Sequence, residues 1–210
     1  MKEASGSAAA RGDKRDSAAA EPPFGEAPKH YVRMIQARAD FTAASALCLA
    51  DGDGRNGAWL AEQGLAVTAV DVSGVATERA LALDARRGVS VERVTADLAA
   101  WVPPAGRQWQ AVFIIYLQGI GALRRRALEV GAAALAPGGW LILEGFAKAQ
   151  AGRPDMGPDD PDRLYDLTEL HAALPGLTVV EALAGRVRLE EGTRHRGAAE
   201  IVRFAARRRR

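Results

Sequence analysis

Short runs of apolar residues alternate along the chain with segments whose apolar residues recur at helical spacing. The apolar runs cover residues 46–50, 66–70, 89–95, 111–116 and 140–143. The helical segments cover residues 29–39, 56–63, 73–86 and 123–135. Nearly continuous apolar strands, mostly joined through helices, are typical of a parallel sheet that is covered on both faces. Ligands of such sheets bind beyond the carboxyl ends of the strands.

The last third of the chain has a different texture. Residues 147–163 are rich in glycine and proline and form a longer connection than packing requires, which indicates a lid loop. A helix over 168–174 follows, and two β runs at 178–189 and 198–204 are joined by a turn over 191–197. The whole pattern predicts a Rossmann-like α/β fold. Its sheet has seven mostly parallel strands, helices on both faces and a C-terminal antiparallel hairpin.

Length and composition predict one domain with two unlike ends. A chain of 210 residues suits a single globular domain. Beyond Met1, residues 1–22 contain no apolar side chain larger than alanine, so we expect a disordered tail without the hydrophobic centre of a secretory signal. The domain is expected over 23–206, followed by four arginines at 207–210 as a basic end.

Charge and cysteine content exclude several classes of partner. Lysine and arginine number 28 against 26 acidic residues, and the formal charge of +2 becomes −2 without the four terminal arginines. The body therefore has no basic excess for nucleic acid. Cys48 is the only cysteine, which suits a reducing, cytoplasmic location. No stretch approaches the roughly 18 apolar residues of a membrane span, so we expect a small-molecule partner.

A glycine motif follows the first predicted strand. Gly52, Gly54 and Gly57 fit G-x-G-x-x-G between a strand and a helix, and Asp71 stands 19 residues after Gly52. The glycines let a ligand approach the backbone closely, and the acid can accept hydrogen bonds from ribose hydroxyls. The motif fits NAD or S-adenosylmethionine equally well, and a tight turn without a ligand is a further alternative. No tyrosine has a lysine four residues later, which excludes the short-chain dehydrogenases but not every NAD-dependent oxidoreductase.

Several segments together resemble the class I S-adenosylmethionine-dependent methyltransferases. These segments are 47–61, 67–73, 96–98 and 135–141. Further motifs resemble the bacterial branch related to tellurite-resistance and thiopurine methyltransferases. They are Gly54-Arg55-Asn56, Phe24-Gly25, Leu164-Tyr165 with Glu169-Leu170, and Glu191-Gly192 with His195-Arg196-Gly197. The resemblance covers residues 24–206.

The resemblance implies S-adenosylmethionine as cofactor and a set of residues that bind it. The cofactor-binding residues it implies are Ala50, Gly52, Gly54, Asn56, Asp71, Val72, Asp97, Leu98 and Tyr116. Asp71 would bind the ribose diol, and Asp97 with Leu98 would contact the adenine. Each aspartate could instead cap a local turn or helix. The chain departs from the family pattern twice, with Ala50 in place of a glycine and Cys48 in place of an acidic residue.

The same resemblance implies a catalytic pair in the terminal hairpin. His195 would assist deprotonation of the acceptor and Arg196 would hold an anionic substrate, whereas the alternative for both is a solvated turn. Methyl transfer is an in-line displacement that depends mainly on positioning, so a thiol or a metalloid oxyanion would need little base assistance. A non-catalytic protein that binds the cofactor is a further alternative. We expect a monomer or a homodimer, and no His/Cys cluster has zinc spacing.

Overall fold

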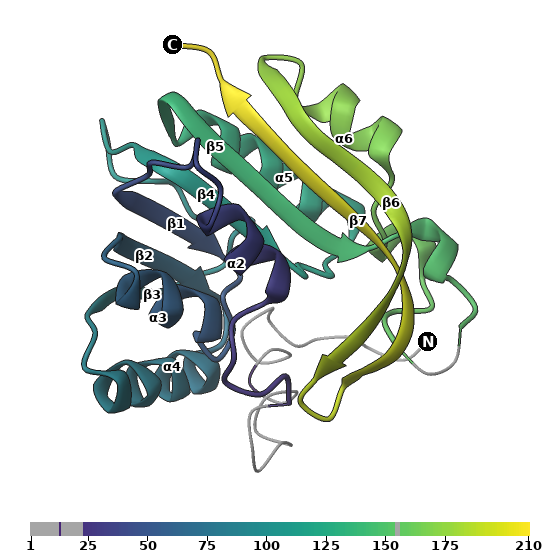
Figure 1. Ribbon diagram of the computed structural model, residues 1–210, viewed down its shortest axis with the longest axis horizontal. Helices are drawn as coiled ribbons and strands as arrows, with labels where there is room; N and C mark the ends of the chain where they lie inside the picture. Colours follow the sequence, from purple (N-terminus) through teal and green to yellow (C-terminus); the bar gives the residue numbers. More distant parts are fainter. Residues whose placement is uncertain (1–12, 14–22, 154–155) are drawn as a thin grey trace.

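The computed structural model describes residues 13, 23–153 and 156–210 and contains one seven-stranded sheet (Figure 1). The strands are β1 Ser45–Leu49, β2 Ala66–Asp71, β3 Val91–Thr95, β4 Trp109–Ile115, β5 Leu135–Phe146, β6 Leu177–Glu191 and β7 His195–Arg208. Their order in the sheet is β3-β2-β1-β4-β5-β7-β6. The first five are parallel, and β7 is antiparallel to both β5 and β6. The predicted Rossmann-like fold is therefore confirmed.

Helices cover both faces of the sheet. They are α2 His30–Gln36, α3 Arg55–Glu62, α4 Gly74–Arg87, α5 Gly121–Ala133 and α6 Leu167–Ala173, with 3-10 turns η1 Lys148–Gln150 and η2 Pro161–Arg163. Leu47 and Leu49 of β1 pack in one apolar core with α5 and α6. Ala46 and Cys48 point the other way, into a second core with α2 and α3. Alternate side chains of one strand thus reach opposite layers, and in Figure 1 α2 lies in front of the sheet with α5 behind it.

Local sequence signals set the ends of α4. The Ser73 hydroxyl accepts a hydrogen bond from the Ala76 N–H at 3.1 Å, which satisfies one of the free donors of the first turn. Gly88 ends the helix in the left-handed conformation with φ 65°. Both signals were visible in the sequence. They place the start of α4 directly beside the end of β2.

The terminal hairpin is longer than its apolar pattern predicts. Glu191 pairs with His195 across a turn of three residues, so His195 lies in β7 and the predicted turn over 191–197 is wrong. At the other end β7 continues through Arg207 and Arg208, two residues beyond the predicted end of the domain. The Arg207 guanidinium lies 4.8 Å from the ring centroid of Trp140 and donates to the Gly138 carbonyl, so this arginine is part of the sheet.

The predicted lid and tail differ in how much of them the structure describes. In the predicted lid, 147–163, Asp162 accepts a hydrogen bond from the Gly121 N–H at 2.9 Å, and its carbonyl accepts one from Arg124 at 2.8 Å. The carboxyl-terminal part of this loop is therefore attached to the start of α5.

The predicted tail, 1–22, lies outside the described residues except for Asp13, whose carboxylate accepts from the Ser73 hydroxyl at 2.8 Å. No helix in the described ranges is long and apolar enough to cross a membrane.

Candidate functional site

The loop after β1 has the backbone of a ligand-binding turn. Ala50, Gly52 and Gly54 have φ values of 60°, 57° and 86°. A Cβ atom added to Gly52 would meet nothing within 4 Å, whereas one added to Gly54 would lie 2.6 Å from the Ala80 Cβ. Gly52 therefore borders open space and Gly54 allows α4 to approach the loop closely. This geometry fits a ligand held against bare backbone at the carboxyl end of β1.

Ala50 adopts the left-handed conformation of the glycine it replaces, and its N–H donates to the Val70 carbonyl at 2.8 Å. We expect Ala50→Gly to raise the free energy of unfolding by about 1 kcal/mol. The left-handed region costs an L residue about 1–2 kcal/mol, and the larger entropy loss of glycine offsets part of this gain. Urea denaturation measures the change. Ala85→Gly on the exposed face of α4 is the control and should lose about 1 kcal/mol; equal losses in both variants would contradict the strain.

Asp71 ties the glycine loop to the end of β2. Its carboxylate accepts hydrogen bonds from the Gly52 N–H at 2.8 Å and the Ser73 N–H at 3.0 Å. The side chain that caps α4 through Ala76 is Ser73. Each oxygen of a carboxylate can accept more than one hydrogen bond. Asp71 therefore lies beside the loop, and a role of Asp71 and Val72 in cofactor binding stays a prediction.

Two other predicted cofactor positions have local partners in the structure. Asp97 is exposed, and its carboxylate accepts from the Ala99 N–H at 2.9 Å, while Leu98 is buried in the first core. Asn56 is buried and its side-chain oxygen accepts from the Lys29 N–H at 2.9 Å. These interactions explain the local turns. A role of Asn56, Asp97 and Leu98 in cofactor binding stays a prediction.

A buried ion network, which sequence reasoning missed, holds the glycine loop against β3 and α4. Arg93 of β3 donates to Asp51 at 2.6 Å and to both carboxylate oxygens of Asp84 at 2.7 and 2.9 Å. Its guanidinium also reaches the Gly54 carbonyl at 3.3 Å. The Asp51 carboxylate in turn accepts from the Gly57 N–H. One arginine therefore links both ends of the glycine loop to α4.

Four rings meet beyond the ends of β4 and β5, and we call them the ring cluster: Phe24, Tyr116, Phe146 and His195. The His195 ring centroid lies 4.6 Å from that of Phe24, 4.7 Å from Tyr116 and 5.4 Å from Phe146. Tyr116 reaches this position with a φ of 56°, and strained non-glycine backbone of this kind occurs often at functional sites. The cluster joins the chain before α2, two central strands and the terminal hairpin.

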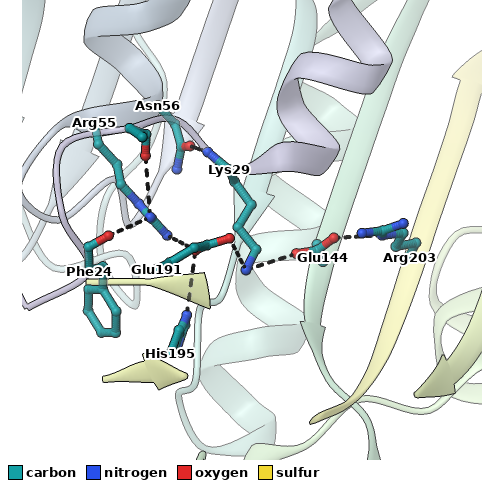
Figure 2. Close-up of polar contacts among 9 residues, drawn as sticks. Phe24, Lys29, Arg55, Asn56, Glu144, Glu191, His195 and Arg203 are labelled. Carbon is teal, nitrogen blue, oxygen red and sulfur yellow. Dashed lines mark hydrogen bonds and ion pairs between the residues drawn. The ribbon is translucent and has the colours of Figure 1, made fainter. Parts of the chain in front are cut away.

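A set of charged side chains, the buried charge cluster, lies beside the ring cluster, and Figure 2 shows it with two of the rings, Phe24 and His195. It consists of Lys29, Arg55, Glu144, Glu191 and Arg203. Lys29 Nζ lies 2.9 Å from Glu191 Oε1, 3.4 Å from Glu144 Oε1 and 4.1 Å from the Tyr116 ring centroid. Arg55 lies 2.9 Å from Glu191, and Arg203 lies 2.7 Å from Glu144. Three cations therefore face two carboxylates.

His195 is buried, with 6% of its surface exposed, so the alternative of a solvated turn residue is wrong for it. Burial lowers the pKa of His195 below its usual 6.5, and the positive charges of Lys29 and Arg55 act in the same direction against Glu191. The ring is consequently neutral at pH 7. Arg196 is exposed, and its Nε donates to the Gly192 carbonyl at 2.8 Å. The structure thus brings His195 into the ring cluster and leaves Arg196 on the surface of the hairpin.

Lys29 and Glu144 are members of the site that sequence reasoning did not single out. Glu144 is fully buried, and it directly follows the most apolar part of β5. Lys29 is 1% exposed and stands before the buried Tyr31 and Val32 of α2. An ionisable residue next to a buried apolar run needs a partner, because an unpaired charge is rarely buried. That signal could have marked both residues.

Comparisons with known proteins agree with this geometry. Residues 46–139 match the model of a methyltransferase domain family. No curated protein sequence matches the chain significantly. Among solved structures, one described for the conversion of a disulfide bond into a thioacetal group during echinomycin biosynthesis is 21% identical, with a TM-score of 0.70, over 90% of this chain and 85% of that chain.

Two further structures extend the comparison. TehB from Haemophilus influenzae is 13% identical with a TM-score of 0.69, over 86% of this chain and 62% of that chain. The N-methyltransferase NodS from Bradyrhizobium japonicum WM9, in complex with S-adenosyl-L-homocysteine, is 16% identical with a TM-score of 0.70, over 94% of this chain and 97% of that chain. At these identities the likeness is one of fold.

The matched domain and the fold together define the class of protein. Residues 46–139 match a methyltransferase domain, and the structure has the fold of S-adenosylmethionine-dependent methyltransferases. The glycine loop and Asp71 lie at the carboxyl ends of β1 and β2, where the fold binds ligands. An NAD-dependent oxidoreductase is accordingly not favoured.

Proposed function

We propose that the protein transfers the methyl group of S-adenosylmethionine to a small molecule whose nucleophilic atom lies against the ring cluster, and that His195 accepts the proton of this atom where it carries one. The observation that carries the proposal is a buried imidazole at the same edge of the sheet as the glycine loop, where burial lowers the pKa of His195 and favours the neutral ring. S-adenosylmethionine supplies an electrophilic methyl group when it is bound. The rings of Phe24, Tyr116 and Phe146 orient the acceptor and exclude water, which favours an in-line approach.

The acceptor class that we propose is an acidic, polarisable nucleophile such as a thiol or a metalloid oxyanion. A thiol is more acidic than an alcohol or an amine, so a weakly basic imidazole accepts its proton more readily than theirs. A metalloid oxyanion is already ionised and needs no base. The structure from echinomycin biosynthesis concerns sulfur chemistry, and motifs of the chain resemble the tellurite-resistance branch; both support this class. Arg196 would hold an anionic part of the acceptor, and the loop 147–163 would act as a lid.

Cofactor binding tests the first half of the proposal. We expect Asp71→Ala to weaken binding of S-adenosylhomocysteine by about 10- to 100-fold, since hydrogen bonds to a charged group contribute about 1.5–3 kcal/mol. Isothermal titration calorimetry measures the dissociation constant. Asp40→Ala, an exposed aspartate in the loop before β1, is the matched control and should bind as the wild type does. Normal binding by Asp71→Ala, or binding of NAD alone, would contradict the assignment.

Methyl transfer itself tests the second half. Cofactor with a labelled methyl group is incubated with thiols, selenium and tellurium oxyanions, and phenols, and the products are separated and counted. We expect transfer to thiols or oxyanions. Tight cofactor binding without transfer to any acceptor would instead support a non-catalytic protein that binds the cofactor.

A further inference from the structure

Glu191 lies between His195 and two cations at the tip of the hairpin (Figure 2). His195 Nδ1 is 3.8 Å from Glu191 Oε2, and Arg55 reaches the same oxygen at 2.9 Å. Lys29 Nζ lies 2.9 Å from the other oxygen, Oε1. Glu191 and His195 are paired directly across β6 and β7, so backbone hydrogen bonding fixes their separation.

The groups that face His195 come from every element around it. Phe24 precedes α2, Tyr116 follows β4 and Phe146 ends β5, and all three present rings. Lys29 and Arg55 are the cations that act on the imidazole, and the carboxylate that acts on it is Glu191. Glu144 meets Lys29 from the far side at 3.4 Å. Within the described part of the chain, Nδ1 has no hydrogen-bond partner, and Glu191 Oε2 lies 3.8 Å from it.

We propose that Glu191 is a positioning residue for His195. Lys29 and Arg55 balance the negative charge of Glu191, so that Glu191 orients the imidazole of His195 without keeping this ring protonated. The Nδ1–H points at the carboxylate, which leaves the lone pair of Nε2 for the proton of the acceptor. The catalytic consequence rests on the proposed function, whereas the arrangement of the three side chains around the imidazole does not.

The charges explain why two cations are needed. A lone carboxylate beside a histidine stabilises the imidazolium and raises its pKa, which would occupy Nε2 with a proton at neutral pH. Although burial raises the pKa of Glu191, the contact with His195 and the charges of Lys29 and Arg55 outweigh it and lower that pKa to about 2. Glu191 therefore remains an anion and can accept from Nδ1–H, while its charge is already balanced by the cations.

The distance of 3.8 Å also fits this role. It is longer than a hydrogen bond, and catalytic contacts often reach hydrogen-bond distance only in the complex with substrate. Arg55 directly follows Gly54 of the glycine loop and donates to the Phe24 carbonyl at 2.8 Å. The same arginine therefore connects the cofactor loop, the ring cluster and Glu191.

Nitrogen-15 NMR of the full chain tests the proposal independently of turnover. We expect the neutral His195 ring to carry its proton on Nδ1. Glu191→Gln should lower the pKa of His195 and Lys29→Met should raise it, each by about one unit, because the first removes an anion and the second a cation. His195→Ala identifies the signal among the three histidines of the chain.

Matched controls separate these effects from general changes in charge. Glu190→Gln removes the neighbouring exposed carboxylate that pairs with Arg188, and Lys148→Met removes an exposed lysine that pairs with Glu169. Neither should move the His195 titration. Should Glu191→Gln fail to fold, Glu191→Asp keeps the charge but withdraws it by one methylene, and we expect it to increase the fraction of the Nε2–H tautomer.

Kinetics provide the second readout. With an acceptor from the transfer screen, Glu191→Gln should lower kcat at least tenfold with little change in KM, and Lys29→Met should move the pH profile to higher pH. Shifts of the His195 pKa in the same direction in both variants, or an Nε2–H ring in the wild type, would overturn the proposal. Expected NMR shifts without any methyl transfer would instead count against the proposed function alone.

Discussion

Replacing Arg93 by methionine is expected to lower the free energy of unfolding by about 3–5 kcal/mol, measured by urea denaturation. The variant leaves the carboxylates of Asp51 and Asp84 buried without their shared cation, since their side chains are only 3% and 6% exposed. Asp51 begins the glycine loop and also holds the Gly57 N–H. We therefore expect weaker binding of S-adenosylhomocysteine together with the loss of stability.

Two further variants distinguish charge from size. Arg107→Met makes the same substitution in an exposed ion pair, in which the Arg107 side chain is 39% exposed and the Glu92 side chain 49%. It should change the free energy of unfolding by less than about 1 kcal/mol. Combining Arg93→Met with Asp51→Asn and Asp84→Asn removes the stranded charges and should recover much of the lost stability. If Arg93→Met is as mild as Arg107→Met, the buried network does not support the loop.

The glycine loop could be predicted from sequence because its requirements are local. Gly52 and Gly54 supply positive φ values within three residues, and the strand and helix on either side follow from short-range patterns. The family resemblance, by contrast, implied that Ala50 stands where the family has a glycine, and in the structure Ala50 has a φ of 60°. The positions of Gly52, Asp71 and Tyr116 at the carboxyl ends of their strands followed from the predicted parallel sheet.

The charge clusters could not be predicted in this way, because their members are far apart in sequence. Arg55 and Glu191 are separated by 136 residues, and Arg93 and Asp51 by 42. Arginines and acidic residues are frequent in this chain, so no spacing marks these pairs before the elements are in place. The partners of these residues can be identified only when the positions of the terminal hairpin, α3 and β3 around the glycine loop are known.

The hairpin shows why the placement of His195 was also missed. Most residues of β6 are exposed because the strand lies at the edge of the sheet, so this strand lacks a clear apolar alternation. Its last residues and the first residues of β7 are held by backbone pairing between Glu190 and Arg196 and between Glu191 and His195. The apolar pattern of the sequence therefore ends before β6 ends and begins after β7 begins. For this reason His195, at the tip of the hairpin, was assigned to the turn.

His195→Ala is expected to lower kcat by about 10²- to 10⁴-fold, the usual contribution of a positioned general base, while binding of S-adenosylhomocysteine stays within about twofold of the wild type. His171→Ala is the control, because that imidazole is exposed on α6 and contacts the Leu167 carbonyl. In the wild type, kcat/KM should rise as the pH is raised through the pKa of His195, which burial holds below 6.5, and should be level above about pH 7. The sign follows from the base form, since only the neutral ring can accept a proton.

The choice of acceptor decides how informative this result is. An acceptor that is already ionised at the assay pH has lost its proton before the reaction. For such an acceptor His195→Ala should lower kcat only by as much as the removal of one ring from the ring cluster does. For a thiol with a pKa well above the assay pH, the full loss is expected, and added imidazole should restore part of the rate by entering the space left by the side chain. A loss of the same size for both kinds of acceptor would mean that His195 orients the substrate and does not accept its proton.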